Sequence, residues 1–156
     1  MGIIIRKANE SDFDAILSLE KELNAFEKAY DEVTNTVEQM KSEKEFFHCF
    51  VAEDKDEGII GSAVYCFVYF LGVGKSLYLD NLYIKESFRG QKIGTKLLDS
   101  IFKIAKDEKC SKIRWQVINW NKKAIALYKK YDAKIDTDWY NCDFDENVIQ
   151  NITSEL

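Results

Sequence analysis

The stretch SFRGQKIGTKLLDSIFKIA, residues 87–105, decides the fold because it joins a glycine-containing turn to a long amphipathic pattern. Its first part places two glycines and the cations Arg89 and Lys92 within six residues. Its second part repeats apolar residues at helical spacing, which predicts a helix with one buried face: Ile93, Leu97, Leu98, Ile101, Phe102 and Ala105. A turn needs only one glycine, so the second glycine and the cations indicate that something negatively charged binds where this helix begins.

The turn has the properties of a phosphate-binding site. Backbone N–H groups between Arg89 and Thr95 have no intrahelical acceptor at the start of a helix, and the helix dipole adds positive potential there. Small residues let a ligand approach this backbone closely. The spacing fits neither a Walker loop nor a G-x-G-x-x-G dinucleotide turn. For so short a motif, a turn with solvated cations is the alternative interpretation.

The rest of the chain predicts an α/β (α+β) fold. Strands are expected at residues 3–5, 46–52, 59–70, 77–84 and 113–118, with a final strand or hairpin over 133–144. Helices are expected from Asn9 or Ser11 through 26, from Thr34 or Thr36 through 40, and over 122–131. This order predicts a mixed, mostly antiparallel central sheet flanked by helices. No proline, linker or internal repeat interrupts the chain, so we expect a single domain over residues 1–156.

Composition limits the class of protein. A hydrophobic content of 46% with 31% charged residues describes an ordinary soluble globular protein. No apolar run reaches membrane-spanning length and no signal peptide is visible, so we expect a cytoplasmic protein without membrane insertion. The net charge of −5 argues against nucleic-acid binding and is compatible with a cationic ligand. The four cysteines lack metal-binding spacing, so we expect reduced thiols and no metal.

Four segments together resemble the GCN5-related N-acetyltransferase (GNAT) superfamily and, within it, the diamine acetyltransferase group of spermidine/spermine and thialysine types. They are IRKANESDFDAILSLEKELNAFEK (5–28), EFFHCFVAE (45–53), LYLDNLYIKESFRG (77–90) and INWNKKAIALYKK (118–130). They follow the family's order and cover nearly the whole chain. The turn matches the superfamily's [RQ]-x-x-G-x-[GA] pattern at Arg89 and Gly94, although Lys92 stands where a glycine is usual. Asp132 likewise replaces a usual glycine.

The resemblance implies a GNAT fold, a homodimer, and transfer of an acetyl group from acetyl-CoA to a primary amine of a small cationic substrate by direct attack on the thioester. The amine could be a diamine, a polyamine or a lysine-like amine. Two alternatives stay open at this point. One is acetylation of a protein or peptide amine, and the other is a CoA-binding module without turnover.

The resemblance also implies three segments that bind acetyl-CoA. A bulged strand would offer backbone groups to the pantetheine arm and the carbonyl, the turn would bind the pyrophosphate, and a later helix would contact the coenzyme. These segments are Leu82, Tyr83 and Ile84; Arg89, Gly90, Gln91, Lys92, Ile93, Gly94 and Thr95; and Asn121, Lys122, Lys123 and Ala124.

Two side chains are the catalytic candidates. By resemblance, Tyr128 is the general acid that protonates the departing thiolate, and a phenol stays protonated at neutral pH. Asp80 is the candidate for taking the amine proton, directly or through water, and for binding the substrate's positive charge. A packing role for Tyr128 and a surface position for Asp80 are the alternatives. His48, the only histidine, is interpreted as structural within a buried strand.

Substrate binding is expected to involve Glu27 and Trp139 beside Asp80. Glu27 matches a substrate-binding acid of the family, and the face of Trp139 could hold an ammonium group. Relatives of the polyamine type usually carry Glu-Asp where this chain has Asp80-Asn81, and an acid is common at the position of Phe70. These departures predict a depleted acidic lining and therefore a shorter or less charged amine.

Overall fold

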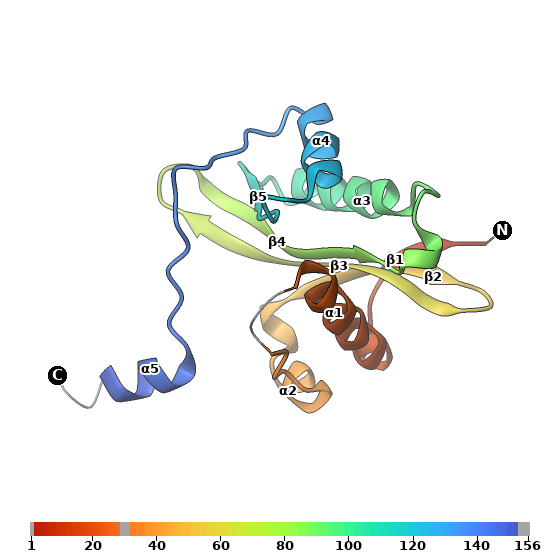
Figure 1. Ribbon diagram of the computed structural model, residues 1–156, viewed down its shortest axis with the longest axis horizontal. Coiled ribbons are helices and arrows are strands. Elements are labelled where there is room, and N and C mark those ends of the chain that lie inside the picture. Colours follow the sequence, from red (N-terminus) through yellow and green to blue (C-terminus); the bar gives the residue numbers. More distant parts are fainter. Residues whose placement is uncertain (1, 29–31, 153–156) are drawn as a thin grey trace. The chain divides into compact units, whose positions relative to one another are not determined.

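A five-stranded sheet forms the frame of the computed structural model, which describes residues 2–28 and 32–152 (Figure 1). Its strands are β1 (Ile4–Lys7), β2 (His48–Asp54), β3 (Gly58–Phe70), β4 (Gly74–Ile84) and β5 (Ile113–Trp115), in that spatial order. Neighbours among β1–β4 pair antiparallel, whereas β5 runs parallel to β4. The predicted mixed, mostly antiparallel sheet is therefore confirmed.

Helices cover both faces of this sheet, with α1 (Phe13–Glu27) and α3 (Ile93–Asp107) on opposite sides (Figure 1). The apolar face predicted for residues 93–105 packs on the sheet, where Leu97, Leu98 and Ile101 are fully buried. On the other face, α1 and α2 (Val37–Ser42) bury a second cluster against β2: Phe13, Ile16, Leu17, Met40, Cys49 and Val51. Short 3₁₀ turns lie at Glu10–Asp12, Lys44–Phe46 and Glu86–Phe88.

The entrance to α1 is fixed by capping and by an ion-pair network. Asn9 caps the 3₁₀ turn before α1 through a capping box with Asp12. The guanidinium of Arg6 lies 2.8 Å from Asp12 and 2.6 Å from Glu53. Hydrogen bonding to Arg6 holds the pKa of Asp12 below its usual value. Thr36 caps α2, which confirms one of its two expected caps, whereas Asn9 caps the 3₁₀ turn before α1 and not α1 itself.

A β-bulge interrupts the pairing of β3 with β4. Val64 pairs with Asn81 and Tyr65 pairs with Leu79, so Asp80 is the extra residue on β4. The register of β4 with β5 covers Leu77 to Leu79 and stops at the same place. Beyond Leu79, the edge of β4 that faces β5 therefore has no strand partner among the described residues.

The chain forms two compact units, Met1–Ile118 and Asn119–Leu156, and the second contains α4 (Lys122–Lys130) and α5 (Glu146–Ile152). The final strand or hairpin expected over 133–144 is wrong, because these residues form neither. Aspartates compete for the backbone there: Asp136 accepts from the N–H of Asp138 at 2.9 Å. Asp145 likewise accepts from the N–H of Val148 at 2.9 Å and caps α5, which the sequence reading missed.

One smaller expectation changed: the strand expected over 113–118 ends at Trp115. Asp132 has a φ of 58°, so this aspartate adopts the left-handed conformation at the position where relatives usually have glycine. In the part of the chain that the structure describes, no helix has the length and apolar character needed to cross a membrane.

Candidate functional site

The bulge directs two successive side chains into one hollow. Side chains normally alternate between the faces of a strand, but Asp80 and Asn81 both line the same cavity of about 420 Å³ beside α1. We call this cavity the acidic pocket. Its polar lining consists of Glu20, Asn24, Glu32, Thr34, Asn35, Asp80 and Asn81, and its apolar lining consists of Ile16, Leu17, Val33, Met40, Phe47 and Val64.

Glu20 is a site residue that the sequence reasoning missed. It lies on α1, and its carboxylate accepts a hydrogen bond from the side-chain amide of Asn81. The available signal was its position seven residues before Glu27, which places both on one face of the helix. Glu20 touches the position where this chain has Asn81, so the pocket contains an acid that the sequence reasoning did not count. Glu32 also lines the pocket, and no pattern in the sequence predicted this position.

Three carboxylates of this region, Glu20, Glu27 and Asp80, are harder to ionise than usual. Burial raises the pKa of Glu20, the hydrogen bond from Asn81 opposes this rise, and the charge of Asp80 adds a smaller increase. Burial and the charge of Glu20 raise the pKa of Glu27. Asp80 is exposed as a residue, yet nearby protein atoms partly dehydrate its carboxylate and raise its pKa.

None of these three acids forms an ion pair with a described lysine or arginine. Several carboxylates that repel one another without a compensating cation favour binding of a positively charged ligand. Among the described residues, no group of three histidine, cysteine or acidic side chains is arranged to hold a metal ion.

The glycine-containing turn leaves backbone N–H groups without helical acceptors at the start of α3. Gly90 has a φ of 82° and Lys92 a φ of 59°, so the chain bends twice through left-handed conformations before α3. The first helical hydrogen bond runs from the N–H of Lys96 to the carbonyl of Lys92, at 3.1 Å. The N–H groups of the intervening residues 93–95 therefore have no acceptor within the helix. Lys92 adopts a conformation that costs a non-glycine residue about 1 kcal/mol.

The turn lies directly against the second half of β4. A Cβ placed on Gly94 would come within 3.8 Å of Leu82 and 3.9 Å of Ile84, which is ordinary contact. The side chains of Tyr83 and Ile84 are buried. The structure thus brings together two of the three predicted coenzyme-binding segments, at the part of β4 that β5 does not pair.

Arg89 holds the turn in place as well as adding charge. Its Nε donates to the carbonyl of Ile84 at 3.1 Å. Its guanidinium lies 4.8 Å from the ring centre of Phe26 on α1 and 5.3 Å from that of Tyr83 on β4. These contacts connect the turn, β4 and the end of α1.

The remaining predicted site residues belong to the second unit. Asn121 caps α4, because its side-chain oxygen accepts from the N–H of Ala124 at 3.2 Å. The exposed Lys122 donates to the carbonyl of Asn119 at 3.0 Å, and Lys123 is also exposed. Tyr128 is half-buried on α4. Trp139 is 83% exposed on a segment without regular structure.

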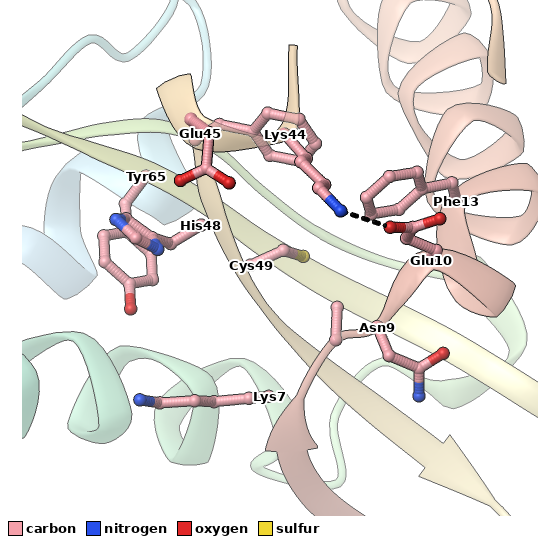
Figure 2. A pocket seen from close by; sticks show the side chains of 11 residues that line it. Lys7, Asn9, Glu10, Phe13, Lys44, Glu45, His48, Cys49 and Tyr65 are labelled. Atoms are coloured by element: carbon pink, nitrogen blue, oxygen red, sulfur yellow. Dashed lines mark hydrogen bonds and ion pairs between the residues drawn. The ribbon is translucent and has the colours of Figure 1, made fainter. Parts of the chain in front are cut away.

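A second hollow of about 420 Å³ lies where β1 ends beside the start of β2 (Figure 2). Within it, Lys44 pairs with Glu10 at 2.8 Å. His48 stacks on Tyr65 with ring centres 5.2 Å apart. His48 is exposed, so the expectation that it lies within a buried strand is wrong.

Comparison with known proteins identifies the family of the chain. The model of the acetyltransferase (GNAT) family matches residues 13–132. A thialysine N-epsilon-acetyltransferase of Sus scrofa is 34% identical over 168 residues, which cover 99% of each chain. Spermidine/spermine N(1)-acetyltransferase-like protein 1 of Homo sapiens is 31% identical over 139 residues, which cover 83% of this chain and 20% of that protein.

A crystal structure of a predicted acetyltransferase from Clostridium acetobutylicum, with acetyl-CoA, has a TM-score of 0.75 to this chain. It is 22% identical, and the match covers 91% of this chain and 96% of that one. Likeness at this identity supports the fold. The family match and the nearly full-length relatives confirm the resemblance and the enzyme class inferred from the sequence: the chain belongs to the acetyltransferase (GNAT) family and is an N-acetyltransferase.

Proposed function

We propose that the protein transfers the acetyl group of acetyl-CoA to a primary amine of a small cationic substrate that binds in the acidic pocket. The observation that carries the proposal is the cluster of Glu20, Glu27 and Asp80. Their pKa values are raised, and no described cation pairs with them. The names of the relatives, thialysine and spermidine/spermine acetyltransferases, support the same class of substrate.

The residues around the turn fit acetyl-CoA, which supplies an acetyl group activated as a thioester. The N–H groups of residues 93–95 and the helix dipole of α3 suit a pyrophosphate. Gly90, Gln91 and Lys92 leave this backbone accessible, since all three are exposed. The backbone of Leu82, Tyr83 and Ile84, which β5 does not pair, would hold the pantetheine arm. The oxygen of the reacting carbonyl would be polarised by the same backbone.

Asp80 would accept the proton of the substrate. An amine reaches the enzyme as an ammonium ion and must lose a proton before it can attack. A carboxylate whose pKa is raised is a better proton acceptor than an ordinary one near neutral pH. Asp80 lines the acidic pocket and comes two residues before Leu82, the first residue of the segment assigned to the pantetheine arm, so we assign it to the reacting nitrogen, directly or through a water.

We assign four further roles in the same proposal. Tyr128 holds the proton that the leaving sulfur receives. Asn121, Lys122, Lys123 and Ala124, at the start of α4, contact the coenzyme. Glu27 stabilises the positive charge of the substrate from α1, and Trp139 contributes an aromatic face to the amine site.

We also infer a homodimer in the cytoplasm. The segment after α4 exposes large apolar side chains, which a second copy would cover: Ile135, Trp139, Tyr140, Phe144, Val148, Ile149 and Ile152. All four cysteines are free thiols, as is usual in a reducing compartment. Light scattering coupled to size-exclusion chromatography should give the mass of two chains. The mass of one chain would contradict the homodimer.

An acetyl-CoA consumption assay over diamines, polyamines, lysine analogues and peptides tests the function. We expect turnover with a small amine and little with peptides. Turnover with peptides alone would assign a protein or peptide acetyltransferase. Binding of CoA without turnover on any amine would mean that the protein is a coenzyme-binding module. Arg89→Glu should weaken CoA binding while the fold persists. Unchanged CoA affinity would mean that the turn is not part of the coenzyme site.

A further inference from the structure

Glu20 and Asn81 form a polar pair across the acidic pocket, one from α1 and the other from β4. The amide nitrogen of Asn81 donates to Glu20. The amide oxygen of Asn81 is buried and accepts no hydrogen bond from any described residue. A buried acceptor without a donor is unfavourable by about 1–3 kcal/mol. The pair therefore presents a carboxylate beside an unfilled acceptor, and both need a donor.

An ammonium group supplies what this pair lacks. It carries a positive charge for Glu20 and three N–H donors, one of which can fill the Asn81 oxygen. Asn81 cannot supply the charge itself, but its hydrogen bond holds the Glu20 carboxylate in the pocket. The remaining acids around Glu20 are Asp80 on β4 and Glu27 on α1, whose charges interact with Glu20. Neither Asp80 nor Glu27 carries a positive charge that could pair with Glu20.

We propose that Glu20, positioned by Asn81, binds the second ammonium group of a dicationic substrate while Asp80 serves the nitrogen that is acetylated. This inference rests on the proposed function and assigns the residue that selects a substrate with two cationic groups. It replaces the expectation of a less charged amine. Glu20 on α1 supplies the negative charge that Asn81 on β4 lacks. The apolar lining of the acidic pocket suits the carbon chain that joins two nitrogens.

The test compares 1,4-diaminobutane with n-butylamine, which has the same carbon chain and one nitrogen. Wild type should show a higher kcat/KM for the diamine. Glu20→Gln keeps an oxygen for Asn81 and removes only the charge. It should lower kcat/KM for the diamine about 10- to 100-fold, the scale of a charged hydrogen bond, and lower kcat/KM for n-butylamine much less. Glu57→Gln, an exposed change of the same kind in the β2–β3 turn, is the matched control.

A double variant keeps the test independent of damage to the fold. Glu20→Gln combined with Asn81→Asp moves the carboxylate from α1 to β4 within the same pocket. It should restore most of the preference for the diamine. Equal losses for both amines in Glu20→Gln, or a double variant as poor as the single one, would overturn the assignment of Glu20. If wild type acetylates neither amine nor any other in the panel, the proposed function itself fails.

Discussion

Two hollows of the same size, about 420 Å³ each, lie in the first unit and differ in how their charges are balanced. The hollow of Figure 2 contains both signs of charge, and its Lys44 and Glu10 neutralise each other at 2.8 Å. The acidic pocket contains carboxylates and amides, and no lysine or arginine is among the described residues that line it. The two hollows therefore do not differ in size. The feature that favours the acidic pocket as the proposed binding site is its uncompensated charge.

The difference originates in one residue of the backbone. β2 and β3 pair in register through His48 and Tyr65 at the Figure 2 hollow, so successive side chains alternate between faces. At the acidic pocket, the bulge at Asp80 breaks that alternation and adds a second polar side chain, Asn81, to the same face. A local insertion thus concentrates polar groups that a regular strand would have separated.

Removing the charge of Asp80 should have the largest effect. Asp80→Asn is nearly isosteric and removes the proposed proton acceptor, so we expect kcat/KM at neutral pH to fall about 100-fold or more. The pH at which activity appears should rise, while CoA affinity stays unchanged. Kinetics against pH for a diamine, together with CoA titration, would measure both. An unchanged pH profile would mean that another base accepts the proton and that Asp80 at most binds the substrate.

The pH dependence of stability separates Glu20 from an ordinary ion-paired acid. Because its pKa is raised on folding, the folded state holds this proton more tightly, and the contribution of Glu20 to stability falls as pH rises from about 4 through the raised pKa. Without substrate, Glu20→Gln should therefore be more stable than wild type at pH 7, by about 1 kcal/mol or less. No gain is expected at pH 3, where both forms are neutral.

Urea unfolding of both proteins at the two pH values measures this difference. Asp12, whose pKa Arg6 lowers, behaves in the opposite way: its stabilisation is present above pH about 4 and is lost as pH falls. Since wild type and Glu20→Gln share Asp12, its effect cancels in the comparison. Lower stability of Glu20→Gln at pH 7 would mean that Glu20 stabilises the fold and is not held there for a ligand.

The smallest effect is expected in the Figure 2 hollow. Lys44 and Glu10 are about half exposed, and water screens an exposed pair of this kind so that it contributes little to stability. Lys44→Met should therefore leave the free energy of unfolding nearly unchanged and leave kcat/KM for every amine at the wild-type value. Thermal unfolding and the amine panel check this. A loss of activity selective for one amine would mean that this hollow, too, binds substrate.

The sequence was sufficient for patterns that are local in the chain. The apolar repeat over 93–105 and the cap at Thr36 depend on neighbouring residues, and the structure confirms them, while Asn9 caps the 3₁₀ turn just before α1. Glu20 could not be recognised in this way, because its role depends on contact with Asn81, sixty-one residues away in the sequence. The segment 133–144 has the aromatic residues of a strand, but the side chain of Asp136 binds the backbone of Asp138 and the segment forms no ladder.

A crystal structure with CoA and 1,4-diaminobutane tests the central claim most directly, because it locates both nitrogens. The account predicts the diamine in the acidic pocket, with one nitrogen within hydrogen-bonding distance of Asp80 and the other within that distance of Glu20 and the Asn81 oxygen. A diamine bound in the hollow of Lys44 and His48, with no density between α1 and Asp80, would contradict it.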